Sequence, residues 1–453
     1  MSIRLAGASL AIVLAMAAPA FARTVDCNED SARLKRVLSR LDDDTTITVK
    51  GNCIGNVTIA TDGVSLVAGD GGASITGQVN VTAQRASISG IDITGPEPSD
   101  GTVIRAGLVV RNAGSASFTN GSIANHSKIG VLAVDNGTVT ITASSVAGNG
   151  TAHIVGVSDG VVATDGGSVF LGAQDANNVP IADASVEIAH NAFRGVFANR
   201  SGAVRILAAN VHDNGAQAAV SAFSGSLRIT GGVLSTPATL PLFDTVVAAF
   251  GGTVDILNDT GDPAGNTTIN SAFGGVLAVD SGAARLRGVT ITTSANATQD
   301  PAVGAFRTAS IRLQGDNTII STGGGTALSA GDAGSVRTDD GTSVALPSGA
   351  NQFKGNVSVT NGGFMRIDDV NPASSITGNI TVAQTGTLAL QVAPAITGNI
   401  TVIGPSTLVA APGPFGFSGT LICFKNGSLL GPVNPVIIGV PGVFNPPTQN
   451  CTP

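Results

Sequence analysis

One unit recurs along most of the chain and restricts the possible folds more than any other feature of the sequence. Each copy begins with a glycine, and the residues that follow alternate between polar and apolar, as in the segment GTVTI that begins at Gly137. Strict alternation is typical of a β-strand with one buried face. The glycines of the clearest copies are Gly114, Gly137, Gly167, Gly202, Gly225, Gly252 and Gly282.

The spacing of these glycines indicates coils of constant size joined by loops of different length. Consecutive glycines lie 23, 30, 35, 23, 27 and 30 residues apart. A unit of this length cannot bury its own apolar face, so neighbouring units must stack on one another. Residues such as Val139 and Ile141 would then point into the coil. We expect the glycines, with nearby Asn and Asp residues, to supply the positive φ angles that sharp corners require.

A second feature recurs between the copies, where a β-branched residue is followed three positions later by a polar one. In stacked coils the polar members would lie above one another, and amide side chains in such a column can hydrogen-bond along it. The alternative interpretation is that asparagine only suits a left-handed turn at these positions. The sequence leaves both interpretations open. The pairs are Ile123 and His126, Val146 and Asn149, Ile188 and Asn191, and Val211 and Asn214.

These glycine-punctuated coils with a column of asparagines resemble the right-handed parallel β-helix proteins of the pectin-lyase-like superfamily. The resemblance covers most of the chain, roughly residues 46–408. It implies an all-β fold, a single right-handed parallel β-helix with a short amphipathic helix closing its N-terminal end. It says little about activity, because this fold carries many different functions.

The composition of the two ends predicts how the chain is divided. Residues 1–22 have the features of a signal peptide, with a basic start, a short apolar run and an Ala-Phe-Ala cleavage site. Residues 23–45 are predicted to form an N-terminal cap that contains the helix, and residues 46–411 the parallel β-helix. Residues 412–453, rich in proline and glycine, are predicted to form a C-terminal cap and tail.

The predicted helix covers residues 28–41, in which leucines and a valine recur on one face. The cysteines lie near the two ends of the predicted rod, and four cysteines allow three connectivities. We expect the pairs Cys27–Cys53 and Cys423–Cys451, because a rod keeps its ends far apart. Disulfides of this kind form in an oxidising compartment, which agrees with export.

Charge and hydropathy exclude several partners. The formal net charge is −7 and no run of basic residues occurs along the sequence, so the chain lacks the electrostatic footprint of a nucleic-acid or lipid-surface binder. No later stretch approaches the length of about 18 apolar residues that a membrane span requires. We therefore expect no nucleic-acid partner and no membrane span. The signal peptide, which is of bacterial type, predicts a secreted, periplasmic or extracellular protein.

The best candidate site lies two residues before the repeat glycines. Asp135, Asp165 and Arg200 occupy this position in successive copies, so stacking would bring two carboxylates beside one guanidinium. Lyases of the superfamily hold Ca²⁺ with aspartates and remove a proton with an Arg or Lys, so the resemblance implies catalytic roles for these residues and calcium ligation by Asp135 and Asp165. The alternative interpretation is ordinary turn chemistry.

Two weaker patterns offer other candidate catalytic groups. Glycoside hydrolysis needs two carboxyl groups, and adjacent aspartates occur at Asp339-Asp340 and Asp368-Asp369. Adjacent residues on a strand face opposite ways, however, and Asp-rich turns are common. His190 and His212 occupy similar parts of neighbouring units, and a histidine there could act as a general base. A surface or column histidine is the alternative.

Two functional hypotheses follow. The first is an exported rod with a structural or surface-interaction role, adhesin-like, whose partner is a polysaccharide or a cell-surface protein. It is favoured by the lack of an intact catalytic motif and by the absence of Trp and Tyr, on which sugar rings usually stack. The alternative is a divergent polysaccharide lyase, epimerase or hydrolase that acts on acidic glycans. The sequence does not decide whether the protein is an enzyme.

Overall fold

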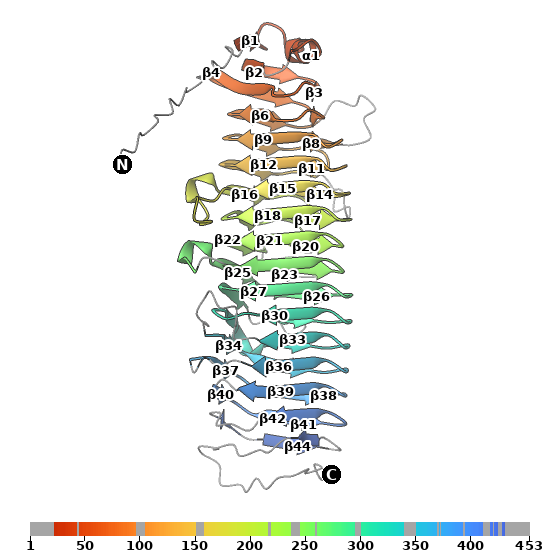
Figure 1. The fold of residues 1–453 in the computed structure, drawn as a ribbon, viewed down its shortest axis with the longest axis vertical. Helices are drawn as coiled ribbons and strands as arrows, with labels where there is room; N and C mark the ends of the chain where they lie inside the picture. Colours follow the sequence, from red (N-terminus) through yellow and green to blue (C-terminus); the bar gives the residue numbers. More distant parts are fainter. Residues whose placement is uncertain are drawn as a thin grey trace, which may run out of the picture.

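Parallel pairing between successive coils defines the architecture. In the computed structural model each coil contributes strands to three faces, here named A, B and C, and each strand pairs in parallel with the equivalent strand of the next coil. The coils stack into the tall column of Figure 1, with the first coil and the last at its opposite ends. The protein is therefore an all-β, right-handed parallel β-helix, as the sequence predicts.

The structure describes residues 22–42, 45–96, 105–150, 158–215, 219–236, 245–258, 261–294, 300–338, 350–368, 371, 373–392, 395–410, 417–419, 421–424 and 428–430. Among these residues no helix is long and apolar enough to cross a membrane.

The strands of each face follow one another up the column. Face A consists of β6 (Ala86–Ser89), β9 (Ser115–Thr119), β12 (Thr138–Thr142), β15 (Ser168–Leu171), β18 (Ala203–Leu207), β21 (Ser226–Thr230), β24 (Thr253–Leu257), β27 (Ala283–Arg287), β30 (Ser310–Leu313), β33 (Ser335–Thr338), β36 (Phe364–Asp368), β39 (Thr387–Val392), β42 (Thr407–Ala410) and β45 (Ser428–Leu430). Face B consists of β7 (Ile91–Thr94), β10 (Ser122–Ala124), β13 (Ser144–Ala147), β16 (Val186–Ala189), β19 (Asn210–His212), β22 (Gly232–Ser235), β25 (Thr267–Ser271), β28 (Val289–Thr293), β31 (Thr318–Ser321), β34 (Gln352–Lys354), β37 (Ser375–Thr377), β40 (Ala395–Thr397) and β43 (Phe417–Ser418). Face C consists of β3 (Val57–Ile59), β5 (Val79–Val81), β8 (Ala106–Val110), β11 (Ile129–Ala133), β14 (Val161–Ala163), β17 (Val196–Asn199), β20 (Val220–Phe223), β23 (Thr245–Phe250), β26 (Gly274–Val279), β29 (Val303–Ala305), β32 (Thr326–Ala330), β35 (Asn356–Val359), β38 (Ile380–Ala383), β41 (Ile400–Ile403) and β44 (Leu421–Phe424).

Faces A and B are joined at the N-terminal end by two long strands. β2 (Thr46–Ile54) and β4 (Ser65–Thr76) run around the corner between these faces, and β4 pairs with both β6 and β7. Beyond β4 each coil breaks at that corner into two separate strands. Face C forms a sheet of its own.

Alternation along the strands separates the inside of the column from its outside. In β12, Val139 and Ile141 are fully buried, whereas the threonines between and beside them are partly exposed. The inward aliphatic side chains of all three faces form one continuous cluster, from Val25 near the N-terminal end to Leu408 near the C-terminal end. A smaller second cluster lies on face C. Each fully buried Val or Ile contributes about 1.5–3 kcal/mol of transfer free energy.

The repeat glycines have a different role from the one the sequence predicts. The positive φ angles at the corner between faces C and A belong to the residues before each glycine, such as Asp135 (φ 50°) and Asn136 (φ 61°). Gly137 itself has no room for a side chain, because a Cβ there would lie 2.2 Å from the backbone oxygen of Val110 in the preceding coil. Close stacking of the coils is therefore what requires this glycine.

The N-terminal end is tied to the first coil. β1 (Ala22–Asp26) pairs in parallel with β2, and the predicted disulfide between Cys27 and Cys53 is confirmed. The helix α1 (Arg33–Leu38) is shorter than predicted, since Cys27 is held at the sheet edge and the helix begins only after a turn. Its buried face belongs to the core cluster. The second predicted pair, Cys423–Cys451, lies outside the residues whose side chains the structure describes.

Candidate functional site

Outward side chains at one position of face A form a line of arginines. The register places each residue of this position beside the equivalent residue of the next coil. Seven successive strands, β18 to β36, take part, and six strand spacings of about 4.8 Å span about 29 Å. We name this line the arginine column. Its members are Arg205, Arg228, Arg285, Arg312, Arg337 and Arg366, with Asp255 between the second and third arginine.

Strand alternation points these guanidinium groups away from the core. Arg228, for example, lies exposed between the buried Leu227 and Ile229 of β21. The neighbouring outward position on the same strands carries small side chains in most coils, such as Ser226 and Ser310, so they do not cover the arginines. Six of the 23 basic residues of the chain thus lie in one line, although the formal net charge is negative.

Several neighbours hold individual guanidinium groups in place. Asp255 and Arg285 form an ion pair that includes a 2.6 Å hydrogen bond from the Nε atom, and Arg366 donates to Asp368 at 2.6 Å. The guanidinium of Arg337 lies 5.6 Å from the ring centroid of Phe364. Asp255 and Asp368 thus lie against arginines of the column, in which six arginines and one aspartate share the aligned position.

Exposed phenylalanines lie beside the same face. Phe223 stacks on Phe250 with ring centroids 4.6 Å apart, and both belong to the corner between faces C and A. Phe170 occupies the position that precedes Arg205 in the column register, and it is also exposed. These side chains offer apolar surface next to the arginine column, in a chain that has no Trp or Tyr.

The predicted site residues Asp135, Asp165 and Arg200 are stacked at the corner between faces C and A. The Asp165 carboxylate lies 3.6 Å from the Arg200 guanidinium, and both side chains are exposed. All three residues have positive φ, as expected for turn residues. Ca²⁺ prefers six to eight oxygen ligands, and among the described residues no group of three or more potential ligands could hold a metal ion. Calcium binding by Asp135 and Asp165 stays a prediction.

The paired aspartates are not seen together. Asp339 and Asp340 lie outside the described residues, as does Asp369. Asp368 faces Arg366 at the edge of the arginine column. Both predicted pairs therefore fall wholly or partly outside the described residues.

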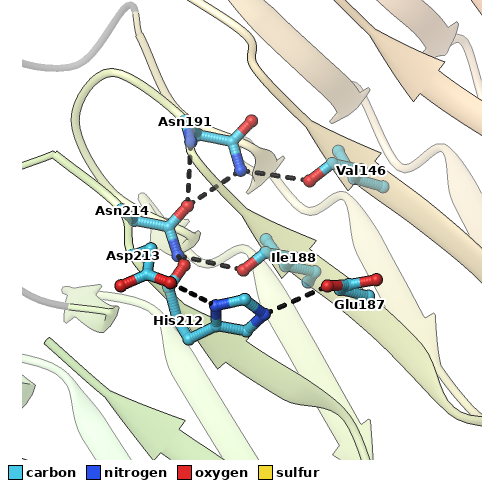
Figure 2. A network of polar contacts seen from close by, with 7 residues as sticks. All are labelled: Val146, Glu187, Ile188, Asn191, His212, Asp213 and Asn214. Atoms are coloured by element: carbon cyan, nitrogen blue, oxygen red, sulfur yellow. Dashed lines mark hydrogen bonds and ion pairs between the residues drawn. The ribbon is translucent and has the colours of Figure 1, made fainter. Parts of the chain in front are cut away.

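The asparagine column predicted from the sequence is present at the corner between faces B and C (Figure 2). Asn149 donates to Asn191, and Asn191 donates to Asn214, both over 2.9 Å. We call these three buried residues the asparagine ladder. Asn191 also donates to the backbone oxygen of Val146, and His126 continues the ladder through its backbone N–H, which donates to Asn149. The positive φ angles lie one residue earlier, as at His190 (φ 55°), so the turn interpretation does not explain the asparagines.

A second, shorter ladder was not predicted. Asn317 donates to Asn351 over 2.9 Å, and the backbone N–H of Asn351 donates to Ser374 over 2.9 Å. Asn317 and Asn351 each lie directly before a strand of face B. An asparagine at this position in two successive coils is the sequence pattern that could have predicted the second ladder.

His212 lies between two carboxylates beside the asparagine ladder (Figure 2). Its Nδ1 atom is 2.8 Å from Asp213 and its Nε2 atom 3.1 Å from Glu187. Burial of the ring lowers the pKa of His212, but the hydrogen bonds and charges of the two carboxylates outweigh this and raise the pKa above its ordinary value. The His190 ring is 6.0 Å away. His212 belongs to face B, whereas the arginine column belongs to face A.

The raised pKa of His212 predicts a pH-dependent contribution to stability. A group with a raised pKa in the folded state stabilises the fold fully below its unfolded pKa of about 6.5, and loses this contribution as pH rises through the folded pKa. We expect His212→Gln to lower the unfolding temperature more at about pH 6 than at about pH 8. His190→Gln serves as the control. A pH-independent difference between wild type and His212→Gln would contradict the role of the two carboxylates.

One buried ion pair was not predicted. Arg194 and Asp159 lie 35 residues apart in the sequence, yet the guanidinium and carboxylate are joined by hydrogen bonds of 2.9 and 3.0 Å. The guanidinium also lies 3.4 Å from the ring centroid of Phe197. Burial raises the pKa of the Asp159 carboxyl, and Arg194 acts in the opposite direction. The pair is almost wholly buried, which indicates a structural role.

Comparison with known proteins finds structural likenesses at low similarity. No family model and no curated protein matches the sequence. One match is a mannuronic-acid-specific family 6 polysaccharide lyase from the human gut microbiota. The match covers 89% of this chain and 82% of the lyase chain, with 11% identity and a TM-score of 0.32. A second match, to a PL6 family alginate lyase, covers 90% of this chain and 89% of the lyase chain, with 9% identity and a TM-score of 0.26. Such TM-scores do not bear on activity, and the fold assignment rests on the strand pairing.

Proposed function

We propose that this protein is an exported β-helix rod that binds an acidic polysaccharide along the arginine column. The observation that carries the proposal is the single line of six guanidinium groups over about 29 Å. A guanidinium binds a carboxylate through two parallel hydrogen bonds. A row of such groups along one face suits an extended polymer that carries a carboxylate on each unit.

Two further observations support a sugar polymer as the ligand. Exposed Phe170 and the stack of Phe223 on Phe250 lie beside the column, and apolar ring faces can contact the apolar faces of sugars. The signal peptide, expected from the sequence, would place the rod where extracellular polysaccharides occur.

Polysaccharide cleavage is a second candidate function. The observation that favours it is the exposed pair of Asp165 and Arg200, which lies at the edge of face A, at the corner that leads into β18. A lyase needs a base that removes the proton next to the uronate carboxyl, and Arg200 is the basic side chain of this pair. Binding along the arginine column is common to both functions, so a binding assay comes first.

Removal of two exposed arginines from the middle of the column tests the proposal. We expect Arg312→Gln/Arg337→Gln to bind alginate or polygalacturonate about 5- to 30-fold more weakly, because each exposed ion pair contributes about 0.5–1 kcal/mol. The salt dependence of binding should also become weaker. Titration calorimetry at two salt concentrations measures both changes.

The matched control removes the same charge elsewhere. Lys354 on face B and Arg40 after α1 are exposed and lie outside the column, so Lys354→Gln/Arg40→Gln should bind the polymers as the wild type does. Equal losses in the two double variants would show that only net charge matters and would overturn the proposal. Tighter binding of single-stranded DNA would indicate nucleic acid instead. Calcium-dependent ultraviolet absorbance from unsaturated ends, abolished in Asp165→Ala, would assign the lyase reaction.

A further inference from the structure

A pocket of about 650 Å³ lies over the N-terminal end of the arginine column, a volume typical of small-molecule sites. Arg205 and Arg228 contribute to it from face A, Asn177 and Asn178 from one side, and Asp262 from the other. The two sides are excursions of the chain between strands of faces A and B. Figure 1 shows them as the segments that project from the column near β16 and β25.

The first excursion, residues 172–185, is held rigid by its own hydrogen bonds. Gln174 and Pro180 form an antiparallel bridge, and the Asp175 carboxylate accepts from the backbone N–H groups of Asn177 and Val179 over 2.8 and 2.9 Å. Gln174 also accepts a hydrogen bond from the Arg205 guanidinium. The excursion is therefore fixed against the first arginine of the column.

The second excursion lies between β24 and β25 and is fixed by Asn258. The side-chain amide of Asn258 donates to the backbone oxygen of Asp262 over 2.8 Å and to Asn266 over 2.7 Å. The Asp262 carboxylate accepts from the backbone N–H of Ala264 over 2.8 Å, at the start of the short helix η2 (Pro263–Gly265). These contacts hold Asp262 at the edge of the pocket.

The two excursions meet at the corner between faces A and B. A Cβ on Gly231 would lie 2.6 Å from the backbone oxygen of Ala264 and 3.5 Å from the Cγ atom of Pro180. Chain from both excursions thus covers this corner, beside the pocket. Along the column, Asp255 follows Arg228 and pairs with Arg285. This pairing separates the two arginines of the pocket from the four that follow.

The polar groups of the pocket select for one kind of ligand. Two guanidinium groups favour an anion, and the amides of Asn177 and Asn178 can donate or accept hydrogen bonds. The carboxylate of Asp262 accepts hydrogen bonds from hydroxyl groups and repels groups with two negative charges. A unit with one carboxylate and several hydroxyls, a hexuronate, satisfies all of these groups.

We propose that this pocket binds the end unit of an acidic polysaccharide, while the arginines from Arg285 to Arg366 bind the chain that follows. The inference rests on the proposed function and deepens it, because the arginines end at Arg205, where Phe170 takes the next position, and the pocket lies at that end of the column. Short uronate oligosaccharides should therefore bind the pocket without the rest of the column. A neutral oligosaccharide or inorganic phosphate should not.

The test uses a uronate trisaccharide and the intact polymer with the same set of proteins. We expect the wild type to bind both, and Arg205→Gln/Arg228→Gln to lose at least about tenfold in affinity for the trisaccharide. Arg312→Gln/Arg337→Gln should bind the trisaccharide as the wild type does but the polymer more weakly. Circular dichroism and the unfolding temperature check that each variant folds, and Asp262→Asn, which keeps both arginines, should gain affinity for inorganic phosphate.

The outcomes separate this inference from the proposed function. Polymer binding by the wild type without any trisaccharide binding would overturn the end-unit site and leave the proposed function standing. Equal trisaccharide losses in both arginine variants would also overturn it. Failure of the wild type to bind either ligand would overturn the proposed function together with the inference.

Discussion

Replacement of Arg194 with methionine is expected to lower the free energy of unfolding by about 3–5 kcal/mol. The Arg194 side chain is 2% exposed and its partner Asp159 is fully buried, so the substitution leaves a carboxylate in the interior with no counter-charge. The methionine retains contact with Phe197 but loses the cation–π interaction of the guanidinium with that ring. Urea unfolding followed by circular dichroism measures the loss.

Arg200→Met is the matched control for Arg194→Met. Arg200 also faces an aspartate, but its side chain is 72% exposed, so water screens the charge of Asp165 when the arginine is removed. An exposed ion pair contributes about 0–1 kcal/mol. The double variant Asp159→Asn/Arg194→Met should recover part of the stability, since no buried charge remains. Similar losses in the two single arginine variants would show that burial of the charge is not the cause.

Asn191→Ala is expected to destabilise the protein by about 2–4 kcal/mol, because several buried groups lose their partners at once. The side chain of Asn191 accepts hydrogen bonds from the backbone and side-chain N–H groups of Asn149. It donates to the backbone oxygen of Val146 and to Asn214.

Asn210→Ala is the control for the ladder variant. Asn210 lies on β19 of face B, in the coil that follows, but its side chain is exposed. Its replacement should change stability by about 0.5 kcal/mol or less. If the asparagines served only as turn residues, Asn191→Gly would be tolerated, because glycine adopts every turn conformation. A loss in Asn191→Gly as large as that in Asn191→Ala therefore supports the ladder.

Much of the fold follows from local patterns. The alternation in GTVTI-like segments predicts which side chains are buried, and Val139 and Ile141 are buried as expected. The column of Asn149, Asn191 and Asn214 could be anticipated because each follows a β-branched residue at a constant distance. The reason for the repeat glycines was harder to predict, since it depends on how closely Gly137 approaches the preceding coil.

The candidate site was only partly predictable. The sequence correctly brings Asp165 beside Arg200, because both occupy equivalent turns of adjacent coils. A search for basic runs misses the arginine column, because a strand contributes at most one arginine to it and more than 20 residues separate one member from the next, as between Arg205 and Arg228. Parallel stacking converts this long period into a spacing of about 4.8 Å. The sequence likewise does not indicate that Arg194 pairs with Asp159, because the two residues lie 35 positions apart.

The sequence by itself determined the coil, because its periodic apolar residues must be buried and can be buried only by stacking. It also predicted the disulfide between Cys27 and Cys53, which depends on the first coil alone, and offered the ladder as one of two interpretations. Only the tertiary structure decided where charge and loops gather. The arginine column depends on register between strands, and the pocket depends on two excursions that meet over Gly231 from different coils. Contacts between distant segments of this kind arise from three-dimensional packing, which no local pattern records.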